Sequence, residues 1–227
     1  MYLLDWGLHH YRERVGDEVS LPKPYYDEGG ITIYCGDCRD ILPHLPKVDL
    51  VLTDPPYGIG LAYASYSDTL DNWIALINDV LPLLRQASQM VILPCCQIAQ
   101  LPFIYSKHTP DWLMCWYKGS PGTRAWVGFN DWEPLLVYGK IKGLQMHDYL
   151  YAAPEPFTNG HPCPKPLRWA THILKRSGAA SVLDSFCGSG TTMQAAKQLG
   201  IRAIGIEIEE KYCEIAVRRL AQEVLPL

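Results

Sequence analysis

Ten consecutive residues decide the fold: Val48-Asp49-Leu50-Val51-Leu52-Thr53-Asp54-Pro55-Pro56-Tyr57. The stretch begins as a short apolar run, which predicts a buried strand. It ends in two prolines, which cannot donate to a neighbouring strand, and Pro56 keeps Pro55 out of the helical region. The stiff backbone after the strand therefore presents a carboxylate, a carbonyl and an aromatic ring at a strand's carboxyl end. Open α/β sheets bind their ligands at that end.

This arrangement suits a planar exocyclic amine, whose lone pair is delocalised into a ring and which is therefore a poor nucleophile. The Asp54 carboxylate and the Pro55 carbonyl can accept hydrogen bonds from its two hydrogens. Those bonds favour the pyramidal nitrogen that forms as the amine attacks an electrophile. Tyr57 can stack on the base, a contact worth ~1–3 kcal/mol. The alternative is a plain strand-to-loop turn, because Asp-Pro is a common turn signal. An apolar strand that runs into Asp-Pro-Pro-Tyr rarely arises by chance.

These residues resemble the catalytic motif of the amino-methylating nucleic acid methyltransferases. Members of that family use S-adenosylmethionine to methylate adenine N6 or cytosine N4. The resemblance implies that Asp54, Pro55, Pro56 and Tyr57 are the catalytic residues.

A second motif runs from Asp184 to Glu207: a strand, a glycine-rich turn, a helix and a second strand that ends in an acid. Glycines at 188 and 190 let a ligand approach the backbone closely. Glu207 stands 17 residues after Gly190, a spacing suited to binding ribose hydroxyls. A plain βαβ crossover is the alternative. A dinucleotide fingerprint has a third glycine where Met193 stands, which weakens an NAD interpretation.

Residues 184–192 resemble instead the family's S-adenosylmethionine motif, with Ser185 at a position that usually holds Pro. Residues 161–166 resemble the segment that encloses the methionine part of the cofactor, with Cys163 and Pro164 in place of the usual Thr and Gln. Gly36-Asp37 resembles the acidic turn near the cofactor adenine. The implied cofactor-binding residues are Asp37, His161, Lys165, Asp184, Phe186, Gly188, Gly190, Thr191 and Glu207.

The order of the two motifs matters, because the catalytic segment precedes the cofactor segment. This order resembles the permuted arrangement called the beta group. It implies an S-adenosylmethionine-dependent, Rossmann-like α/β fold with a mostly parallel sheet, an antiparallel hairpin strand, and catalytic and cofactor strands side by side. We expect residues 1–30 to be an N-terminal extension and 31–227 a single methyltransferase domain. Recognition loops are expected at about 58–72 and 118–160, since 227 residues leave no room for a separate recognition domain.

Periodicity supplies the remaining elements. Strands are predicted at 31–34, 90–93, 112–117, 133–138, 181–184 and 201–207, and the alternation of strands with helices predicts a mostly parallel sheet. Asp68 is predicted to cap a helix that Pro82 kinks or ends. Gly200 should end the helix that begins at Thr191. Residues 141–164 show little periodicity and are predicted to be irregular.

Composition narrows the setting. No apolar run approaches the ~20 residues that span a bilayer, and the start of the chain lacks a signal-peptide pattern. We therefore expect a cytoplasmic protein, bacterial or phage-encoded. Its eight scattered cysteines predict reduced thiols and no metal site, although Cys35 and Cys38 have metal-like spacing. The formal net charge of −4 argues against a surface coated in positive charge, so we expect any contact with nucleic acid to be local. Candidate DNA contacts are Lys118, Arg124, Trp126, Lys140 and Lys142.

The sequence thus favours a DNA adenine-N6 methyltransferase that acts on a base flipped out of the duplex. In the family, Asp at the first motif position accompanies adenine more often and Ser accompanies cytosine. Cytosine N4 and RNA adenine remain as alternatives, as does a catalytically inactive DNA-binding subunit. A homodimer and a cognate restriction enzyme are partners that the sequence leaves open.

Overall fold

The computed structural model describes residues 21–63, 65–95, 100–119, 123–124, 128–141, 146–154 and 165–221, with only the backbone described at 123 and 124. The strands are β1 (Tyr26–Glu28), β2 (Ile31–Cys35), β3 (Val48–Leu52), β4 (Ser88–Pro94), β5 (Trp112–Tyr117), β6 (Thr123–Arg124), β7 (Phe129–Asn130), β8 (Trp132–Gly139), β9 (Tyr149–Tyr151), β10 (Ser181–Asp184) and β11 (Arg202–Glu207). The helices are α1 (Cys38–Ile41), the 3₁₀ turn η1 (Leu42–His44), α2 (Leu70–Ala87), α3 (Leu101–Lys107), α4 (Leu167–Ser177), α5 (Thr191–Leu199) and α6 (Glu210–Ala221).

In the described part of the chain, one mixed sheet of nine strands has the order β1-β2-β11-β10-β3-β4-β8-β5-β9. Strands β2, β11, β10, β3 and β4 run parallel to one another. Strand β8 pairs antiparallel with both β4 and β5. The predicted α/β architecture, mostly parallel with an antiparallel hairpin, is confirmed.

The catalytic and cofactor strands lie side by side, as the permuted order implied. Leu50 pairs with Val182, and Val51 pairs with Leu183, in the parallel ladder between β3 and β10. The permuted order of the motifs in the sequence therefore leaves the two motifs adjacent in the folded sheet. Both of them end at the same edge of the sheet, because parallel strands share their carboxyl ends.

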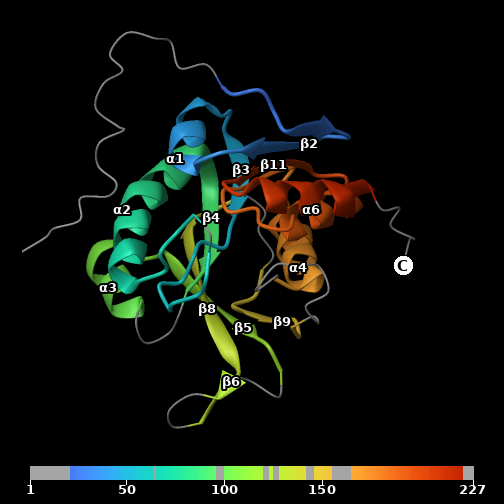
Figure 1. Ribbon diagram of the computed structural model, residues 1–227. Helices are drawn as coiled ribbons and strands as arrows, with labels where there is room; N and C mark the ends of the chain where they lie inside the picture. The colour runs from blue at the N-terminus through green and yellow to red at the C-terminus, as the bar shows by residue number, and fades with distance from the viewer. Residues whose placement is uncertain are drawn as a thin grey trace, which may run out of the picture.

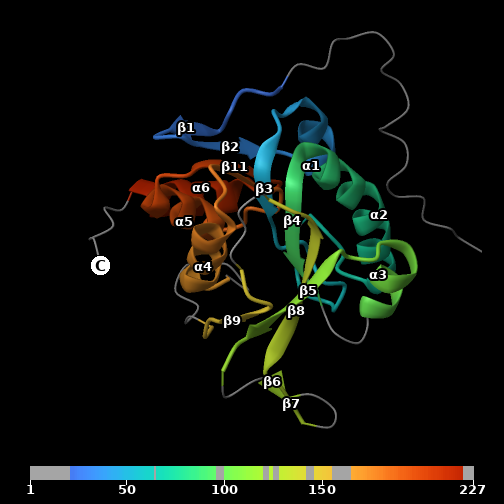
Figure 2. The same cartoon turned by 180° about the vertical axis from the view of Figure 1, so that it is seen from behind.

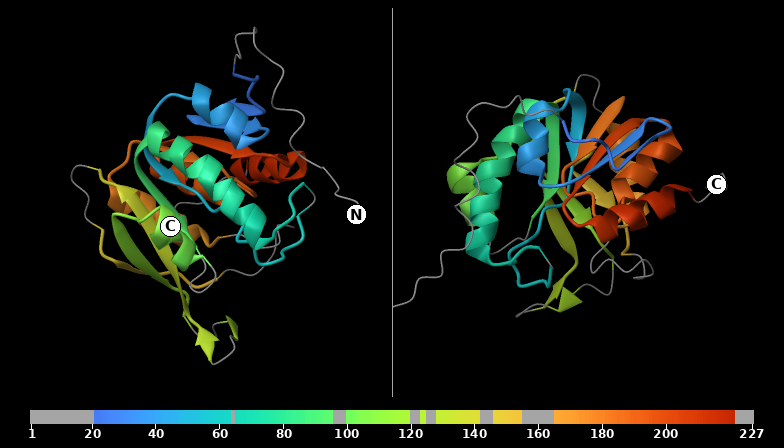
Figure 3. Two further views of the ribbon diagram at one scale, coloured as in Figure 1. Left: turned by 90° about the vertical axis from the view of Figure 1, so that its left-hand side faces the viewer. Right: turned by 45° about the horizontal axis from the view of Figure 1, so that its top comes forward.

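Helices cover both faces of the central sheet. Helices α1, α2 and α3 lie on one face, and α4, α5 and α6 lie on the other (Figures 1 and 2). Figure 3 shows the same layers from two further directions, with the long helix α2 crossing in front of the sheet in the left panel. Leu50 and Leu52 belong to the core cluster beneath α4, whereas Val51 belongs to the cluster beneath α2. The apolar run is continuous because alternate side chains fill opposite cores.

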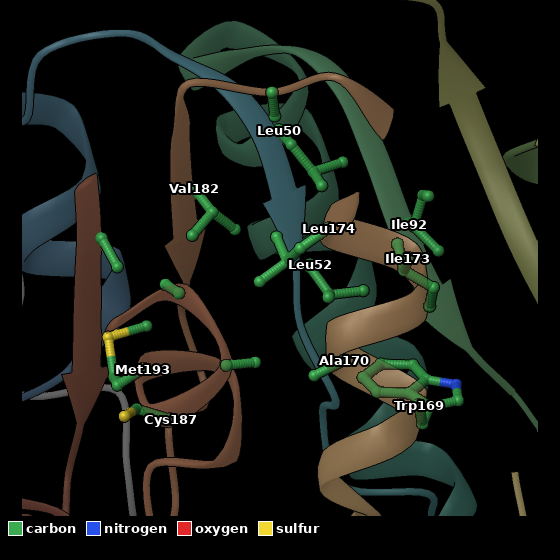
Figure 4. Packing of buried hydrophobic residues seen from close by; sticks show 14 of the residues in the cluster. Leu50, Leu52, Ile92, Trp169, Ala170, Ile173, Leu174, Val182, Cys187 and Met193 are labelled. Carbon is green, nitrogen blue, oxygen red and sulfur yellow. The ribbon is translucent and has the colours of Figure 1, made fainter. Parts of the chain in front are cut away.

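The core beneath α4 is dominated by large side chains. Trp169, Ile173 and Leu174 of α4 pack towards Leu50 and Leu52 of β3 (Figure 4). All five are at most 1% exposed. Helix α4 thus supports the strand that carries the catalytic motif, at its carboxyl end.

The predicted N-cap of α2 was wrong, as was one of the two effects predicted for Pro82. The helix does not end at Pro82 but continues to Ala87. Leu81 and Leu84, which flank the proline, are buried in the core, so tertiary packing outweighs the cost of about 3 kcal/mol for an interior proline. The N-cap is Thr69, whose hydroxyl accepts from the Asn72 amide, and not Asp68.

Several short elements escaped the sequence analysis. Strand β1 pairs antiparallel with β2, so part of the expected N-terminal extension belongs to the sheet. Strand β9 pairs parallel with β5 inside a region predicted to be irregular. Helix α3 is the next described element after β4. Each is three to seven residues long, too short for periodicity to reveal.

The strands β6 and β7 form a small antiparallel hairpin that extends away from the body of the molecule (Figures 1 and 2). None of the described helices is long and apolar enough to cross a membrane.

Candidate active site

A cavity of about 440 Å³ opens at the carboxyl edge of the parallel strands. Asp54, Pro56 and Tyr57 line it after β3, and Asp37 lines it after β2. The glycine-rich turn after β10 and Glu207 at the end of β11 complete the wall. The two motifs predicted from the sequence therefore share one cavity. Pro55 is buried behind this wall.

The Asp54 carboxylate is held by two side chains. Lys165 Nζ lies 2.8 Å from Asp54 Oδ2, and the Tyr57 hydroxyl donates to Asp54 Oδ1 at 2.8 Å. Lys165 also donates to the Tyr57 hydroxyl at 2.9 Å. Burial raises the pKa of Asp54, while the charge and hydrogen bond of Lys165 act to lower it. Lys165 was predicted as a cofactor residue, and in the structure its ammonium group pairs with the Asp54 carboxylate.

Tyr57 is fixed at both ends. The side-chain amide of Gln100, which is fully buried, donates to the Tyr57 carbonyl. At the other end, Glu133 Oε2 lies 3.3 Å from the Tyr57 hydroxyl. The Lys165 ammonium group also lies 4.8 Å from the centre of the Tyr57 ring, in cation–π geometry.

A buried polar junction joins the two motifs below the cavity. The Thr53 hydroxyl donates to Asp184 Oδ1 at 2.8 Å, and the Phe186 amide donates to the same oxygen at 3.1 Å. Burial raises the pKa of Asp184 to about 6, against the lowering effect of its hydrogen bonds. Asp184 therefore fixes β3 against the glycine-rich turn, and Phe186 lines the cavity above it.

The glycine-rich turn is shaped by Glu207. Its Oε2 accepts the Gly188 amide and its Oε1 accepts the Glu209 amide, each at 2.8 Å. Burial raises the pKa of Glu207, while these backbone hydrogen bonds lower it. Glu207 was predicted to bind ribose hydroxyls, and in the structure it also braces the turn.

Two predicted cofactor residues have structural contacts of their own. Gly190 has a φ of +81°, and a Cβ there would lie 2.7 Å from the Cβ of Ala216. Its lack of a side chain thus lets α5 pack against α6. The Thr191 hydroxyl donates to the Lys165 carbonyl at 3.2 Å, which ties α5 to the segment that carries the lysine.

Asp37 caps helix α1 and pairs with Arg39 at 2.6 Å. Burial acts to raise the pKa of Asp37, but hydrogen bonds from Arg39 outweigh it and the pKa is lowered. Asp37 therefore lines the cavity as a carboxylate. His161 lies outside the described residues.

The structure describes two of the predicted DNA-contact side chains, and neither is placed as a contact near the target base would require. Lys118 forms an ion pair with Glu133 at 2.9 Å and is 10% exposed, so its charge is directed inward. Lys140 follows Gly139, which pairs with Met90 near the start of β4. That position is at the opposite edge of the sheet from Asp54, so Lys140 is removed from the contacts expected near the target base. Arg124 lies in β6, where its side chain is not described, and Trp126 and Lys142 lie outside the described residues.

The sequence analysis missed the structural roles of two acids near the site. Asp68 is 4% exposed, and its carboxylate accepts the amides of Gly58, Ile59 and Leu61 at 2.6, 3.1 and 2.9 Å. Glu133 stands at the cavity end of β8. The sequence feature that could have pointed to Glu133 is its position as a single acid directly before the apolar run of a predicted strand. For Asp68, the corresponding feature is the glycine-rich loop that precedes it.

S-adenosylmethionine fits this set of residues. The carboxylates of Asp37 and Glu207 line the cavity as acceptors that suit the amino and hydroxyl groups of the cofactor, and the side chains of Phe186 and Ile208 provide apolar surface for a purine. Among the described residues, no group of His, Cys, Asp and Glu side chains is arranged to hold a metal ion.

Comparisons with known proteins agree with this geometry. A family model described as DNA methylase, covering N6 and N4 methylases, matches residues 107–218. The type II methyltransferase M2.DpnII of Streptococcus pneumoniae is 41% identical over 90% of this chain and 95% of its own length.

Solved structures share the fold. The crystal structure of the M1.HpyAVI–SAM complex superposes with a TM-score of 0.62 at 24% identity, covering 85% of this chain and 100% of that one. The PvuII DNA methyltransferase, described as cytosine-N4-specific, gives a TM-score of 0.68 at 13% identity, covering 92% of this chain and 90% of that one. With 41% identity to M2.DpnII along nearly the full length of both chains, this chain belongs to the family of N6 and N4 DNA methyltransferases.

Proposed function

We propose that the protein is a DNA adenine-N6 methyltransferase that acts on a base flipped out of the duplex. The family uses S-adenosylmethionine, and this chain carries both of its motifs around one cavity. The observation that supports the proposal most strongly is the Asp54 carboxylate. It lines the cavity at the end of β3, next to the cofactor strand, and is ion-paired to Lys165.

Asp54 is the group that meets the target amine. When bound, S-adenosylmethionine supplies an electrophilic methyl group on a sulfonium. The Asp54 carboxylate accepts a hydrogen bond from the amine and stabilises the positive charge that grows on its nitrogen. Preorganised charge of this kind is often the largest single contribution to catalysis.

Lys165 keeps Asp54 in its reactive form. Because burial raises the Asp54 pKa, an isolated carboxylate at this position would bind a proton more readily. The Lys165 ammonium at 2.8 Å opposes that effect and fixes the orientation of the carboxylate. Positioning of this kind can carry much of the rate when the methyl donor is already reactive.

Tyr57 and two further tyrosines provide surfaces for the base. Tyr57, Tyr63 and Tyr66 all line the cavity, and the rings of Tyr63 and Tyr66 make an edge contact at 6.3 Å. An aromatic lining suits a base that has left the stack of the duplex, a step that costs a few kcal/mol.

The choice of adenine rests on Asp at position 54, since Asp accompanies adenine more often in the family. Aromatic walls also suit a purine. Cytosine N4 is the second candidate, because the family model covers both amines and the PvuII enzyme shares the fold. Asp54 and Lys165 would act in the same way on either amine.

DNA is the proposed partner, with the β6–β7 hairpin as its first point of contact beyond the cavity. The hairpin extends from the cavity end of β5 and β8. An enzyme of this kind works where bacterial DNA lies, in the cytoplasm. A homodimer and a cognate restriction enzyme remain predictions.

Nucleoside mass spectrometry tests the proposal. DNA and RNA of mixed sequence are incubated with labelled methyl donor, digested and separated. Labelled N6-methyladenine from DNA is expected, and Asp54→Asn protein serves as the matched control. N4-methylcytosine as the main product would correct the base but keep the mechanism, whereas label only in RNA would refute DNA as the substrate.

A further inference from the structure

The Tyr57 hydroxyl lies where two ion pairs meet. One is Asp54 with Lys165, and the other is Glu133 with Lys118. The hydroxyl is 2.8 Å from Asp54 Oδ1, 2.9 Å from Lys165 Nζ and 3.3 Å from Glu133 Oε2. Two carboxylates and one ammonium group therefore contact a single phenol, and Lys118 is linked to it through Glu133.

The chemistry of the phenol limits how these contacts can be used. A tyrosine hydroxyl has one proton to donate, whereas an ammonium group can only donate. Lys165 must therefore direct a hydrogen at the phenol oxygen. The single phenol proton is left to be shared between two carboxylates, and the shorter distance assigns it to Asp54.

The target amine needs the same Asp54 carboxylate. In the structure, each Asp54 oxygen already accepts a hydrogen bond, one from Tyr57 and one from Lys165. An oxygen released from the phenol has more electron density for the hydrogens of the amine. Because the phenol proton has a second acceptor, the hydrogen bond from Tyr57 to Asp54 can be given up at a small cost in free energy.

We propose that Glu133 is a positioning residue that acts through Tyr57. When the amine binds Asp54, the Tyr57 hydroxyl turns its proton from Asp54 Oδ1 to Glu133 Oε2. No covalent bond is made or broken in this exchange. Lys118 Nζ lies 2.9 Å from Glu133 Oε1, so it holds the other oxygen of that carboxylate aimed at the phenol.

The position of Glu133 separates this role from cofactor binding. Glu133 and Lys118 are not among the residues that line the cavity, whereas Tyr57, Asp54 and Lys165 are. Glu133 stands in β8, and Lys118 follows β5 at the base of the β6–β7 hairpin. The exchange thus connects the segment proposed to meet DNA with the catalytic carboxylate.

A double-mutant cycle tests the inference. Glu133→Gln keeps the size of the side chain but removes the charge, and we expect kcat to fall about tenfold, as for loss of a hydrogen bond to a charged group. Affinity for S-adenosylmethionine should stay within about twofold. In a Tyr57→Phe background the same change should have little further effect, because the phenol is gone.

Two comparisons make the cycle decisive. Lys118→Gln should cost less than Glu133→Gln, because Glu133 remains as an acceptor. Glu214→Gln removes a carboxylate from an exposed ion pair with Arg218 and is the matched control. Equal losses from Glu133→Gln in both backgrounds, or full activity in Glu133→Gln, would overturn the proposal.

A second measurement tests the contact between Glu133 and Tyr57 without depending on methyl transfer. The inference rests on the proposed amine chemistry, so a failure of that function must be distinguishable. Protein labelled at the Cζ carbon of tyrosine gives one resonance for Tyr57, identified by its loss in Tyr57→Phe. Glu133→Gln should shift that resonance and Glu214→Gln should not. An unshifted resonance in Glu133→Gln contradicts the contact, whatever base is methylated.

Discussion

Lys165 and Asp54 form an ion pair across 2.8 Å in the wall of the cavity. Asp54 follows β3, and Lys165 precedes α4, so the pair exists only in the folded chain. It gives the carboxylate that we propose to be catalytic a partner of opposite charge in a place where burial raises its pKa. The pair leads directly to a prediction about pH.

Lys165→Gln should move the acid limb of the kcat profile to higher pH. Asp54 must be ionised to accept from the amine, so activity falls as the pH drops through its pKa. That pKa is already raised by burial, and the loss of Lys165 raises it further. Rates at saturating substrate across the acid range measure the shift. Lys175→Gln, an exposed change on α4, should leave the limb in place, and an unchanged limb in Lys165→Gln contradicts the assignment.

Asp54→Asn should abolish most methyl transfer but leave the affinity for the cofactor nearly unchanged. The amide keeps the shape of the side chain but not the charge that faces the amine, and a loss of roughly 100-fold or more in kcat is expected. Affinity for S-adenosylmethionine, measured by calorimetry, should stay within a few-fold of wild type. Near-normal turnover in this variant would contradict the mechanism in which the Asp54 carboxylate accepts from the amine.

Glu207→Gln should weaken cofactor binding about tenfold. Both Glu207 oxygens accept backbone amides, from Gly188 and Glu209. A glutamine has only one oxygen to accept, so one of these bonds is lost and the wall of the cavity is disturbed. Calorimetry measures the change, and Glu214→Gln is the surface control. An affinity equal to that of wild type shows that Glu207 does not shape the cofactor site.

Asp184→Asn should flatten the dependence of stability on pH. Burial raises the Asp184 pKa from 3.8 to about 6, so between these values the folded state binds more protons than the unfolded state. The free energy of unfolding should therefore fall by roughly 3 kcal/mol as the pH rises through this window, and then level off. Urea unfolding at several pH values, taken as the difference between wild type and variant, reveals this contribution. Asp148→Asn, on the exposed turn before β9, should not change the slope.

Asp68→Ala should destabilise the protein more than Thr69→Ala. Asp68 holds three backbone amides of the loop after the catalytic motif, and its loss leaves them without their charged acceptor, at a cost of about 2–4 kcal/mol. Thr69 is the N-cap of α2, a contact worth about 1 kcal/mol. Urea midpoints compare the two variants. The reverse order would contradict the role of Asp68 in holding this loop.

The sequence by itself determined the elements with long or sharply bounded patterns. The apolar run 48–52 is a strand in the structure, and Gly200 ends α5 in a left-handed conformation. Motif residues at the carboxyl ends of β3, β10 and β11 were placed correctly, because parallel strands bring such ends together. Local pattern and motif chemistry were sufficient for these features.

Only the tertiary structure decided which charges meet. Whether Lys118 faces DNA or Glu133, and whether Asp68 caps a helix or holds a loop, depends on neighbours far away in the chain. The same is true of α2, where core packing carries the helix past Pro82. A sequence pattern records which face of an element is apolar, but an ion pair depends on distance and burial, which arise only when the elements pack together.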